Sequence, residues 1–259
     1  MYQSLIVEFD PDTHVATATM NRPTALNAID EAVLTDFGNL WNWAREDIAV
    51  HAVVLRGAAE SRAFSSGLDL RGPNRVVRHP NVFVNRSVHE RLSPKLHMMY
   101  KPVIAAVHGI CAGAGQFLIN ECDISICSDD AQFFDPHLAI GGASAMGPIA
   151  MSRLVNLSEV LRYILLSSAE RLTAETALRI GLVTEITTRE NLWPRAQELA
   201  QIVAGWDSVA VQGTLRAIWD GLELGRKSAL ERAHLYSDAS RASGAGEFRP
   251  FAKASYTLR

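Results

Sequence analysis

The sequence predicts an α/β fold, and three features of the chain support this prediction. Short apolar runs of strand length recur, as at residues 52–56 and 103–107. Glycines and other small residues follow these runs, as at residues 108–115. Stretches with helical apolar periodicity come between the runs and dominate the chain after residue 134. Strands that alternate with helical crossovers are typical of α/β proteins.

The first part of the chain is predicted to be a β-hairpin, a helix and a strand. Residues 4–9 and 14–20 are the hairpin strands, and the second alternates small and β-branched side chains. Asp30 is the expected N-cap of the helix, because its carboxylate can accept a hydrogen bond from the first turn. Residues 52–56 form the next strand, and residues 72–80 are a loop rich in Pro, Gly, Asn and Arg. The buried face of the helix is expected to carry Val33, Phe37, Trp41 and Ala44.

Helices are expected to predominate in the second half of the chain. Residues 85–99 read as one helix that ends before Pro102, and short strands then alternate with turns up to about residue 134. Residues 206–208 are the best domain boundary, so we expect a core at 1–205 and a C-terminal helical region at 206–259. The later helices are expected at residues 147–155, 158–166, 173–180, 190–204, 208–222 and 227–236.

Composition excludes several classes of protein. The 259 residues suffice for one domain with a full core. A net charge of −3, without a basic patch, gives no reason to expect nucleic acid or a membrane as partner. No apolar run approaches the roughly 18 residues of a membrane-spanning helix. No signal peptide is evident and the three cysteines form no C-x-x-C unit, so a cytoplasmic protein with buried thiols is expected. The eight histidines have no ligand spacing, so no metal site is expected.

Two strand-to-turn segments can present backbone N–H groups to an anion. In residues 103–115, an apolar strand passes through Gly113-Ala114-Gly115 into an apolar helical stretch. The start of a helix leaves free N–H groups and the positive end of its dipole at one point. In residues 63–70, Gly67 lets the backbone approach a ligand closely. Such turns can hold an anion or the developing oxyanion of a carbonyl, although small residues also serve only for packing.

The order and spacing of several motifs resemble the crotonase (enoyl-CoA hydratase/isomerase) superfamily. The matching segments are Asn-Arg-Pro-Thr-Ala-Leu-Asn-Ala at 21–28, Ala-Phe-Ser-Ser-Gly-Leu-Asp-Leu at 63–70, residues 101–115 and residues 172–183. The resemblance covers roughly residues 1–205. It implies a spiral core of repeated ββα turns with a helical C-terminal oligomerisation region. It also implies a homotrimer or dimer of trimers acting on acyl-CoA, with coenzyme A as part of the substrate and no separate cofactor.

The resemblance also implies an oxyanion hole made from backbone N–H groups. The first donor would be Leu68 and the second Ala114, where the family usually has glycine. A changed side chain leaves the backbone N–H donor in place, although the Cβ of Ala114 leaves the substrate carbonyl less room to reach that donor than a glycine would. The residues expected to line the coenzyme A path are Ala25, Leu26, Leu68, Asp69, Leu70 and Arg71, and Phe117 is expected to contact the substrate in an apolar pocket, although core packing would also explain it.

The two glutamates of the usual hydratases are absent from this sequence. Phe117 stands at the first position and His137 at the second. An imidazole can act as acid or base near neutral pH, so His137 is the leading candidate for proton transfer. Asp135 would share a face with His137 in an extended segment and orient its ring. Alternatively, His137 caps a turn after Pro136 and Asp135 forms an Asx-turn.

Glu121 is the second catalytic candidate. It lies four residues after Phe117, so on a helix it shares that face one turn further on. The surrounding segment is apolar, which implies either a partnered carboxylate with a raised pKa or an oligomer contact. His108 replaces a common family asparagine, and a structural role is expected for it.

The predicted function is that of an acyl-CoA thioester enzyme of the enoyl-CoA hydratase/isomerase type. A single acid–base group suits double-bond isomerisation, whereas hydration also needs a positioned water. Two alternatives remain: a hydrolase that cleaves carbon–carbon bonds of β-dicarbonyl compounds, and a non-catalytic acyl-CoA-binding protein. The sequence leaves open the acyl chain, the reaction and its direction.

Overall fold

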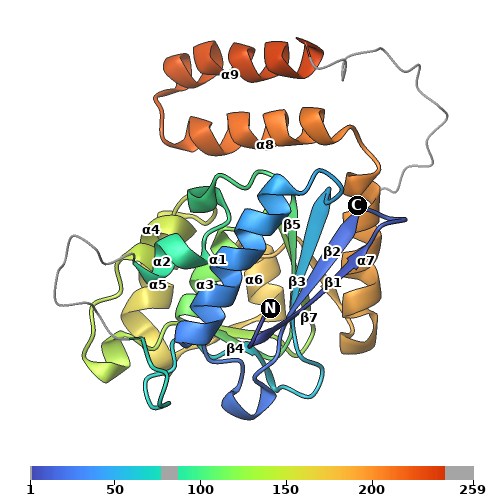
Figure 1. Ribbon diagram of the computed structural model, residues 1–259. Coiled ribbons are helices and arrows are strands. Elements are labelled where there is room, and N and C mark those ends of the chain that lie inside the picture. Colours follow the sequence, from blue (N-terminus) through green and yellow to red (C-terminus); the bar gives the residue numbers. More distant parts are fainter. Residues whose placement is uncertain (1, 77–86, 243–259) are drawn as a thin grey trace. The chain divides into compact units, whose positions relative to one another are not determined.

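The computed structural model describes residues 2–76 and 87–242, and the chain divides into two compact units, Met1–Gly205 and Trp206–Arg259 (Figure 1). The first unit carries two β-sheets with helices around them, which is the predicted α/β class. The second unit consists of helices in its described part.

Six strands form the larger sheet in the order β1-β2-β3-β5-β7-β10. β1 and β2 pair antiparallel, which confirms the predicted hairpin, and the other neighbours pair parallel. The strands are β1 Leu5–Asp10, β2 Val15–Met20, β3 Ala52–Gly57, β5 Val103–Val107, β7 Ile124–Ser128 and β10 Glu185–Thr187.

Four short strands form the smaller sheet in the order β4-β6-β8-β9. The chain runs β3-β4, β5-β6 and β7-β8, and each pair places its first strand in the larger sheet and its second in the smaller one. Helical segments lead from one pair to the next, so the path is the expected ββα spiral. The strands are β4 Ala63–Ser65, β6 Ile110–Ala112, β8 Gln132–Phe134 and β9 Leu172–Thr173.

Seven α-helices belong to the described part of the first unit. Asp30 caps the first of them by accepting a hydrogen bond from the Val33 N–H at 3.0 Å, as predicted. The helices are α1 Glu31–Glu46, α2 Val88–Leu92, α3 Ala114–Asn120, α4 Met146–Met151, α5 Leu157–Leu166, α6 Ala174–Arg179 and α7 Arg189–Ala204.

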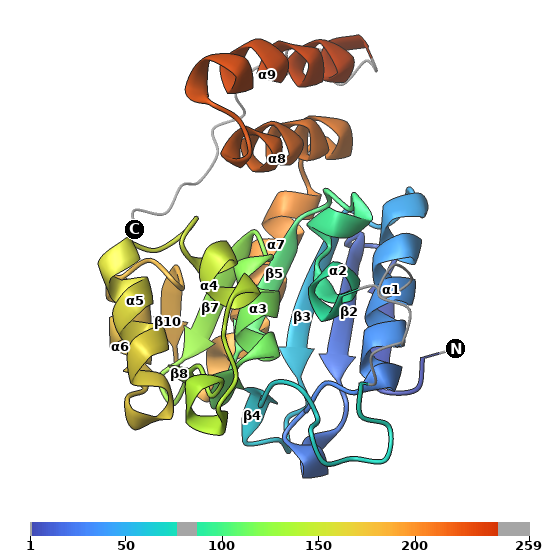
Figure 2. The same cartoon turned by 90° about the vertical axis from the view of Figure 1, so that its left-hand side faces the viewer.

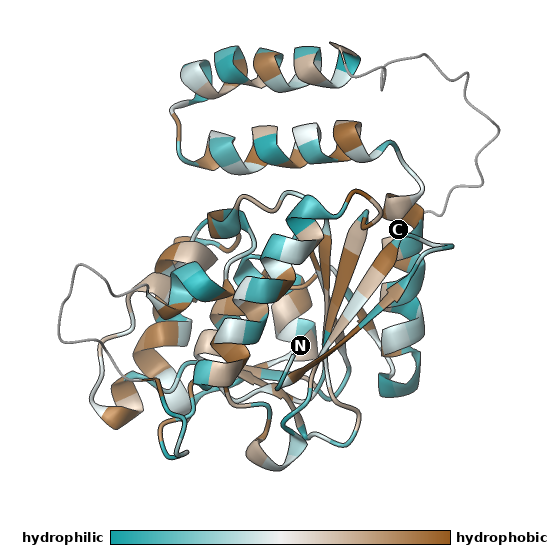
Figure 3. Ribbon diagram, in the orientation of Figure 1, coloured by the Kyte–Doolittle hydropathy of each residue, from teal (hydrophilic) through white to brown (hydrophobic). Residues whose placement is uncertain are grey.

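The central strands of the larger sheet are buried on both faces, and Figures 1 and 2 show helices on either side of the sheet. Val53 and Leu55 pack in one apolar cluster with α1, whereas Val54 packs in a second cluster with α7. Successive residues of a strand point to opposite faces, so the two clusters lie on the two sides of the sheet. Figure 3 accordingly colours the central strands mainly as hydrophobic.

The prediction of a single helix over residues 85–99 was wrong. α2 ends at Leu92, and a separate 3-10 turn covers Lys95–His97. Ser93 is extended, with ψ 122°, because the ring of Pro94 disfavours the helical conformation in the residue before it. Residues 85 and 86 lie outside the described residues, as do residues 77–80 of the predicted loop.

The second unit contains the two expected C-terminal helices, α8 Ser208–Leu222 and α9 Arg226–Ser240. Asp207 caps α8 by accepting a hydrogen bond from the Ala210 N–H at 2.9 Å. The Tyr236 hydroxyl on α9 donates a hydrogen bond to Asp220 on α8 and so joins the pair. Oligomerisation through this region stays a prediction.

Two further expectations concern cysteines and membrane spans. Cys111, Cys122 and Cys127 are free and buried, as expected for structural thiols. Across residues 2–76 and 87–242, no helix is long and apolar enough to cross a membrane.

Candidate active site

Two glycine turns meet where β4 and β6 end. These strands are parallel neighbours, so the turns that follow them lie at one edge of the smaller sheet. Gly67 has φ +94° and Gly113 has φ +53°, a region that side-chain-bearing residues rarely adopt. A side-chain carbon on Gly67 would lie 3.0 Å from the Ala112 carbonyl oxygen and 3.5 Å from the Ala114 nitrogen. Glycine therefore allows the two turns to touch.

The N–H groups of Leu68 and Ala114 are free at this junction. Ile29 N–H donates to Gly67 O at 2.8 Å, and Asp69 N–H donates to Ile29 O at 2.9 Å. In such a parallel bridge the N–H of the intervening Leu68 points away from Ile29. Ala114 is the first residue of α3, where N–H groups lack helical partners. Neither group donates a hydrogen bond within the described residues.

A histidine–aspartate pair follows β8 beside these turns. Asp135 Oδ1 lies 2.9 Å from His137 Nδ1 and also accepts the His137 N–H at 2.9 Å. The His137 side chain is 37% exposed and that of Asp135 only 5%, so the ring faces outward from a buried carboxylate. Pro136 approaches the other turn, since a side-chain carbon on Gly113 would lie 3.6 Å from its Cδ.

The predicted contact between Asp135 and His137 is present, but its geometry differs from the predicted one. His137 is helical, with φ −58° and ψ −48°, rather than extended. The contact arises because Asp135 forms a tight turn that gathers both the backbone N–H and the ring of His137. Both alternatives raised by the sequence, ring orientation and an Asx-type turn, therefore occur together.

The pair has complementary pKa shifts. Burial disfavours the ionised Asp135, but hydrogen bonds from His137 outweigh it and lower the pKa of the carboxyl. The hydrogen bond to Asp135 raises the pKa of His137. Ser144 Oγ donates to Asp135 Oδ2 at 3.0 Å and Ser167 Oγ donates to Asp135 O at 2.7 Å, so the aspartate is held on several sides.

Phe117 lies on α3 with a second histidine against it. Its side chain is 5% exposed, and the ring of His89 on α2 meets it edge to face at 4.5 Å between centroids. Sequence reasoning missed His89, because no motif marks it. Only the packing of α2 on α3 brings the two rings together.

Glu121 has a protein partner. It ends α3, and its carboxylate accepts a hydrogen bond from the Ser93 hydroxyl in the turn after α2. This contact joins α2 to the end of α3. Of the two alternatives that the sequence left open, a partnered carboxylate and an oligomer contact, it supplies the partner of the first. Its catalytic role stays a prediction.

The segment 21–28 lies against the first donor turn. Leu26 O accepts the Ser66 N–H at 3.0 Å, and Asn27 Nδ2 donates to Ala63 O at 2.9 Å. Leu26 and Asn27 have positive φ values of 53° and 51°, and such strain clusters at functional sites. Ala25 and Leu26 are thus brought next to residues 66–68.

Asp69, Leu70 and Arg71 continue from the same turn. The Asp69 carboxylate accepts hydrogen bonds from Arg22 at 3.0 Å and from the Gly72 N–H at 2.7 Å, which gives it a role in holding the loop. Leu70 and Arg71 are exposed beside it. Contact of these residues with substrate stays a prediction.

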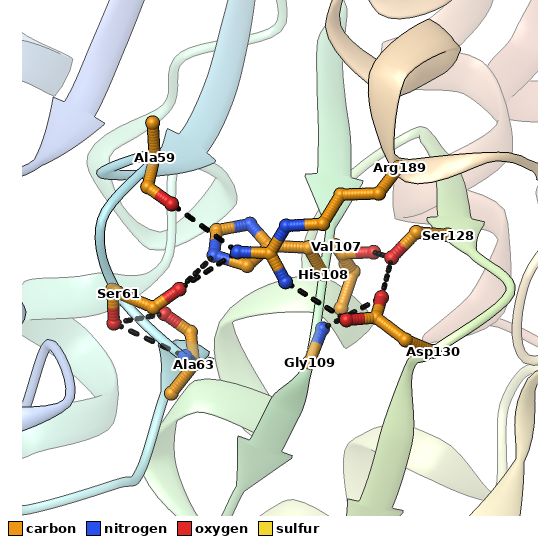
Figure 4. A network of polar contacts seen from close by, with 9 residues as sticks. All are labelled: Ala59, Ser61, Ala63, Val107, His108, Gly109, Ser128, Asp130 and Arg189. Carbon is orange, nitrogen blue, oxygen red and sulfur yellow. Dashed lines mark hydrogen bonds and ion pairs between the residues drawn. The ribbon is translucent and has the colours of Figure 1, made fainter.

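His108 belongs to a separate structural network, drawn in Figure 4. His108 Nε2 lies 3.1 Å from Ser61 O, and Arg189 donates to the same oxygen at 2.8 Å while it pairs with Asp130 at 2.8 Å. Burial, followed by the charge of Arg189, lowers the pKa of His108 to about 4. The network joins the start of α7 to the ends of β5 and β7.

No group of three or more possible metal ligands occurs among the described His, Cys, Asp and Glu side chains.

The ββα spiral is the fold of the crotonase-like proteins, to which the enoyl-CoA hydratases and isomerases belong. The chain matches the enoyl-CoA hydratase/isomerase family model over residues 11–242, and it belongs to that family.

Proteins of similar sequence occur in several organisms. The short-chain-enoyl-CoA hydratase of Clostridium acetobutylicum is 32% identical over 228 residues, which cover 86% of this chain and 85% of that protein. The (E)-benzylidenesuccinyl-CoA hydratase of Thauera aromatica is 30% identical over 234 residues, covering 89% and 87%. The crystal structure of an enoyl-CoA hydratase/isomerase from Mycobacterium paratuberculosis matches with a TM-score of 0.83 at 34% identity, covering 92% of this chain and 91% of that one.

Proposed function

We propose that the chain is an acyl-CoA thioester enzyme of the enoyl-CoA hydratase/isomerase type, with Leu68 and Ala114 as an oxyanion hole and His137 as an acid–base group. The observation that carries the proposal is the meeting of the two glycine turns beside Pro136, the residue between Asp135 and His137. Membership of the family supports an acyl-CoA substrate.

The two N–H groups would bind the thioester carbonyl oxygen. Negative charge on that oxygen grows as an enolate forms, and fixed donors stabilise the charged state more than the neutral carbonyl. One such donor is worth about 3–4 kcal/mol of barrier in a well-studied hydrolase. Because Gly67 and Gly113 fix the turns, this stabilisation requires no reorganisation during the reaction.

His137 would move a proton at the carbon next to that carbonyl. The hydrogen bond to Asp135 raises the pKa of His137 and so favours its protonated form, which can donate a proton to an enolate and be restored from solvent. The buried Asp135 fixes the orientation of the ring through Nδ1. Phe117 can transfer no proton, which separates this site from the two-glutamate arrangement.

The remaining parts of the proposal follow the family resemblance. Ala25, Leu26, Leu70 and Arg71 would line the coenzyme A path, with coenzyme A as part of the substrate. A homotrimer or a dimer of trimers is the proposed assembly.

The test is incubation with saturated, 2-enoyl, 3-enoyl and 3-oxoacyl-CoAs, with products followed by mass spectrometry and binding measured in parallel. A gain of one water, or a shifted double bond, supports the proposal. His137→Gln is expected to lower kcat by about 10²-fold, the scale of general acid–base catalysis. Turnover that is unchanged in this variant would refute the role of His137, and binding without conversion would make the chain an acyl-CoA-binding protein.

A second candidate is hydrolytic carbon–carbon cleavage of a β-dicarbonyl compound. It is favoured by the half-exposed ring of His137 on a buried carboxylate, an arrangement that can also activate water. The 3-oxoacyl-CoA arm separates the two functions, because only cleavage yields two shorter acyl products.

A further inference from the structure

A second imidazole lies at the candidate site and has no part in the proposed function so far. His89 on α2 packs its ring against Phe117 at 4.5 Å between centroids, with an interplanar angle of 86°. Its Nδ1 atom is buried and has no hydrogen-bond partner within the described residues. Buried ring nitrogens in folded proteins are normally partnered, so this atom has a capacity for a hydrogen bond that the described residues do not fill.

His89 and His137 also influence each other electrostatically. Burial first, and then the charge of His137, lower the pKa of His89, whereas the hydrogen bond to Asp135 raises that of His137. The surroundings therefore favour the neutral form of the first ring and the protonated form of the second. Two titratable groups whose surroundings drive their pKa values apart are the usual mark of an acid and a base in one site.

We propose that His89 is the second proton-transfer group of this site and takes the part of the carboxylate that Phe117 replaces. The inference rests on the proposed function. Its physical basis is the position of His89. The imidazole packs against the Phe117 ring, so its titratable nitrogens lie next to the position where the usual hydratases have a carboxylate.

In the hydration direction, the two histidines would together add one water to the substrate. A water held by neutral His89 attacks the β-carbon of a 2-enoyl thioester, and His89 takes one proton from it. The carbon–carbon π pair moves to the α-carbon and carbonyl, where Leu68 and Ala114 hold the enolate oxygen. His137 then gives its proton to the α-carbon. Solvent returns a proton to His137 and removes one from His89, so the net change is the addition of one water.

The other charged groups described near α2 have partners of their own. Glu90 accepts the Ser87 N–H at 2.6 Å in the helix cap. Arg91 pairs with Glu31 at 2.7 Å, and Glu121 accepts from Ser93. Asp135 pairs with His137, whose charge is the one that lowers the pKa of His89 after burial. The pH dependence of activity is therefore expected to report these two histidines as a coupled pair.

The experiment is the pH profile of kcat/KM for whichever acyl-CoA the wild type converts. Activity rises with pH as His89 loses its proton and falls at higher pH as His137 loses its own, giving a bell. His89→Gln keeps a polar side chain but removes the titrating group, so we expect kcat to fall by about 10²-fold and the acidic limb to vanish. His137→Gln should remove the basic limb instead.

Two further variants separate chemistry from folding. His89→Phe preserves ring packing on Phe117, so a fold retained by circular dichroism together with lost activity supports the proposal. His14→Asn is the matched control, because His14 stacks on His51 at 4.3 Å and its φ of +59° suits asparagine. This control should keep the wild-type profile.

The outcomes distinguish the two proposals. A wild type that converts no acyl-CoA in the panel refutes the proposed function, whatever His89 does. A wild type that is active, with His89→Gln unchanged in kcat and in both limbs of the profile, refutes the role of His89 alone.

Discussion

Replacement of His108 by asparagine should make the stability of the protein less dependent on pH. His108 is 1% exposed, and its pKa is lowered from 6.5 to about 4 by burial and by Arg189. Above pH 6.5 the ring is neutral in both the folded and the unfolded chain. As the pH falls toward 4, only the unfolded chain binds the proton, so stability is lost over that interval.

The size of this effect follows from the difference between the two pKa values. About 2.5 pH units at about 1.36 kcal/mol each give a loss on the order of 3 kcal/mol at the acidic end. Asparagine does not titrate, so the His108→Asn variant lacks this contribution. Every other titrating group is common to the two proteins and cancels in the difference between them.

The assay is urea unfolding of both proteins at a series of pH values between about 4 and 7.5. The free energy of unfolding of the wild type should fall more steeply with acid, and the two curves should converge or cross. Curves that stay parallel throughout would show that His108 is as easily protonated in the folded state as in the unfolded chain, and the reasoning from burial would then be wrong.

Three further predictions concern the candidate site and the core. Asp135→Asn should lower the pKa of His137, read from its ring proton resonance by NMR, because the carboxylate that raises it is gone; an unmoved titration would contradict the pairing. Gly67→Ala should cost about 1–3 kcal/mol in urea unfolding, because φ +94° is strained for alanine and the new carbon meets Ala112 O at 3.0 Å; an unchanged midpoint would argue against a tight turn. Lys95→Met should cost about 3–5 kcal/mol, because it removes the ammonium group that lies 2.8 Å from the Asp123 carboxylate, which is 5% exposed; a Tm within error of wild type would contradict this.

The fold could be read from the sequence wherever periodicity and turn chemistry agreed. The hairpin of β1 and β2, the Asp30 cap and the strand Val103–Val107 are local patterns, and each was found as predicted. The prediction of one helix over residues 85–99 was wrong because it followed the helical periodicity of the apolar residues and neglected the effect of Pro94. Pro94 disfavours a helical conformation of the preceding residue, and the helix ends there.

Beyond what the family resemblance implied, the candidate site was predictable only where neighbours in sequence form it. The contact between Asp135 and His137 spans two residues, so the sequence suggested it, although a turn rather than a strand produces it. His89 and Phe117 are brought together by the packing of two helices, and no local pattern encodes that contact. Likewise, Glu121 accepts a hydrogen bond from Ser93, which only the folded arrangement of the chain brings close to it.

The two free N–H groups belong to the main chain, and this has an evolutionary consequence. A point mutation can exchange the groups at positions 117 and 137 without deleting either donor. Glycines 67 and 113 are the constrained positions, because their φ values hold the donors in place. Under the proposed function, reaction type could thus diverge through a few surrounding side chains while the backbone that would bind the carbonyl stays the same. The absence of both glutamates from this chain is a difference that such a division permits.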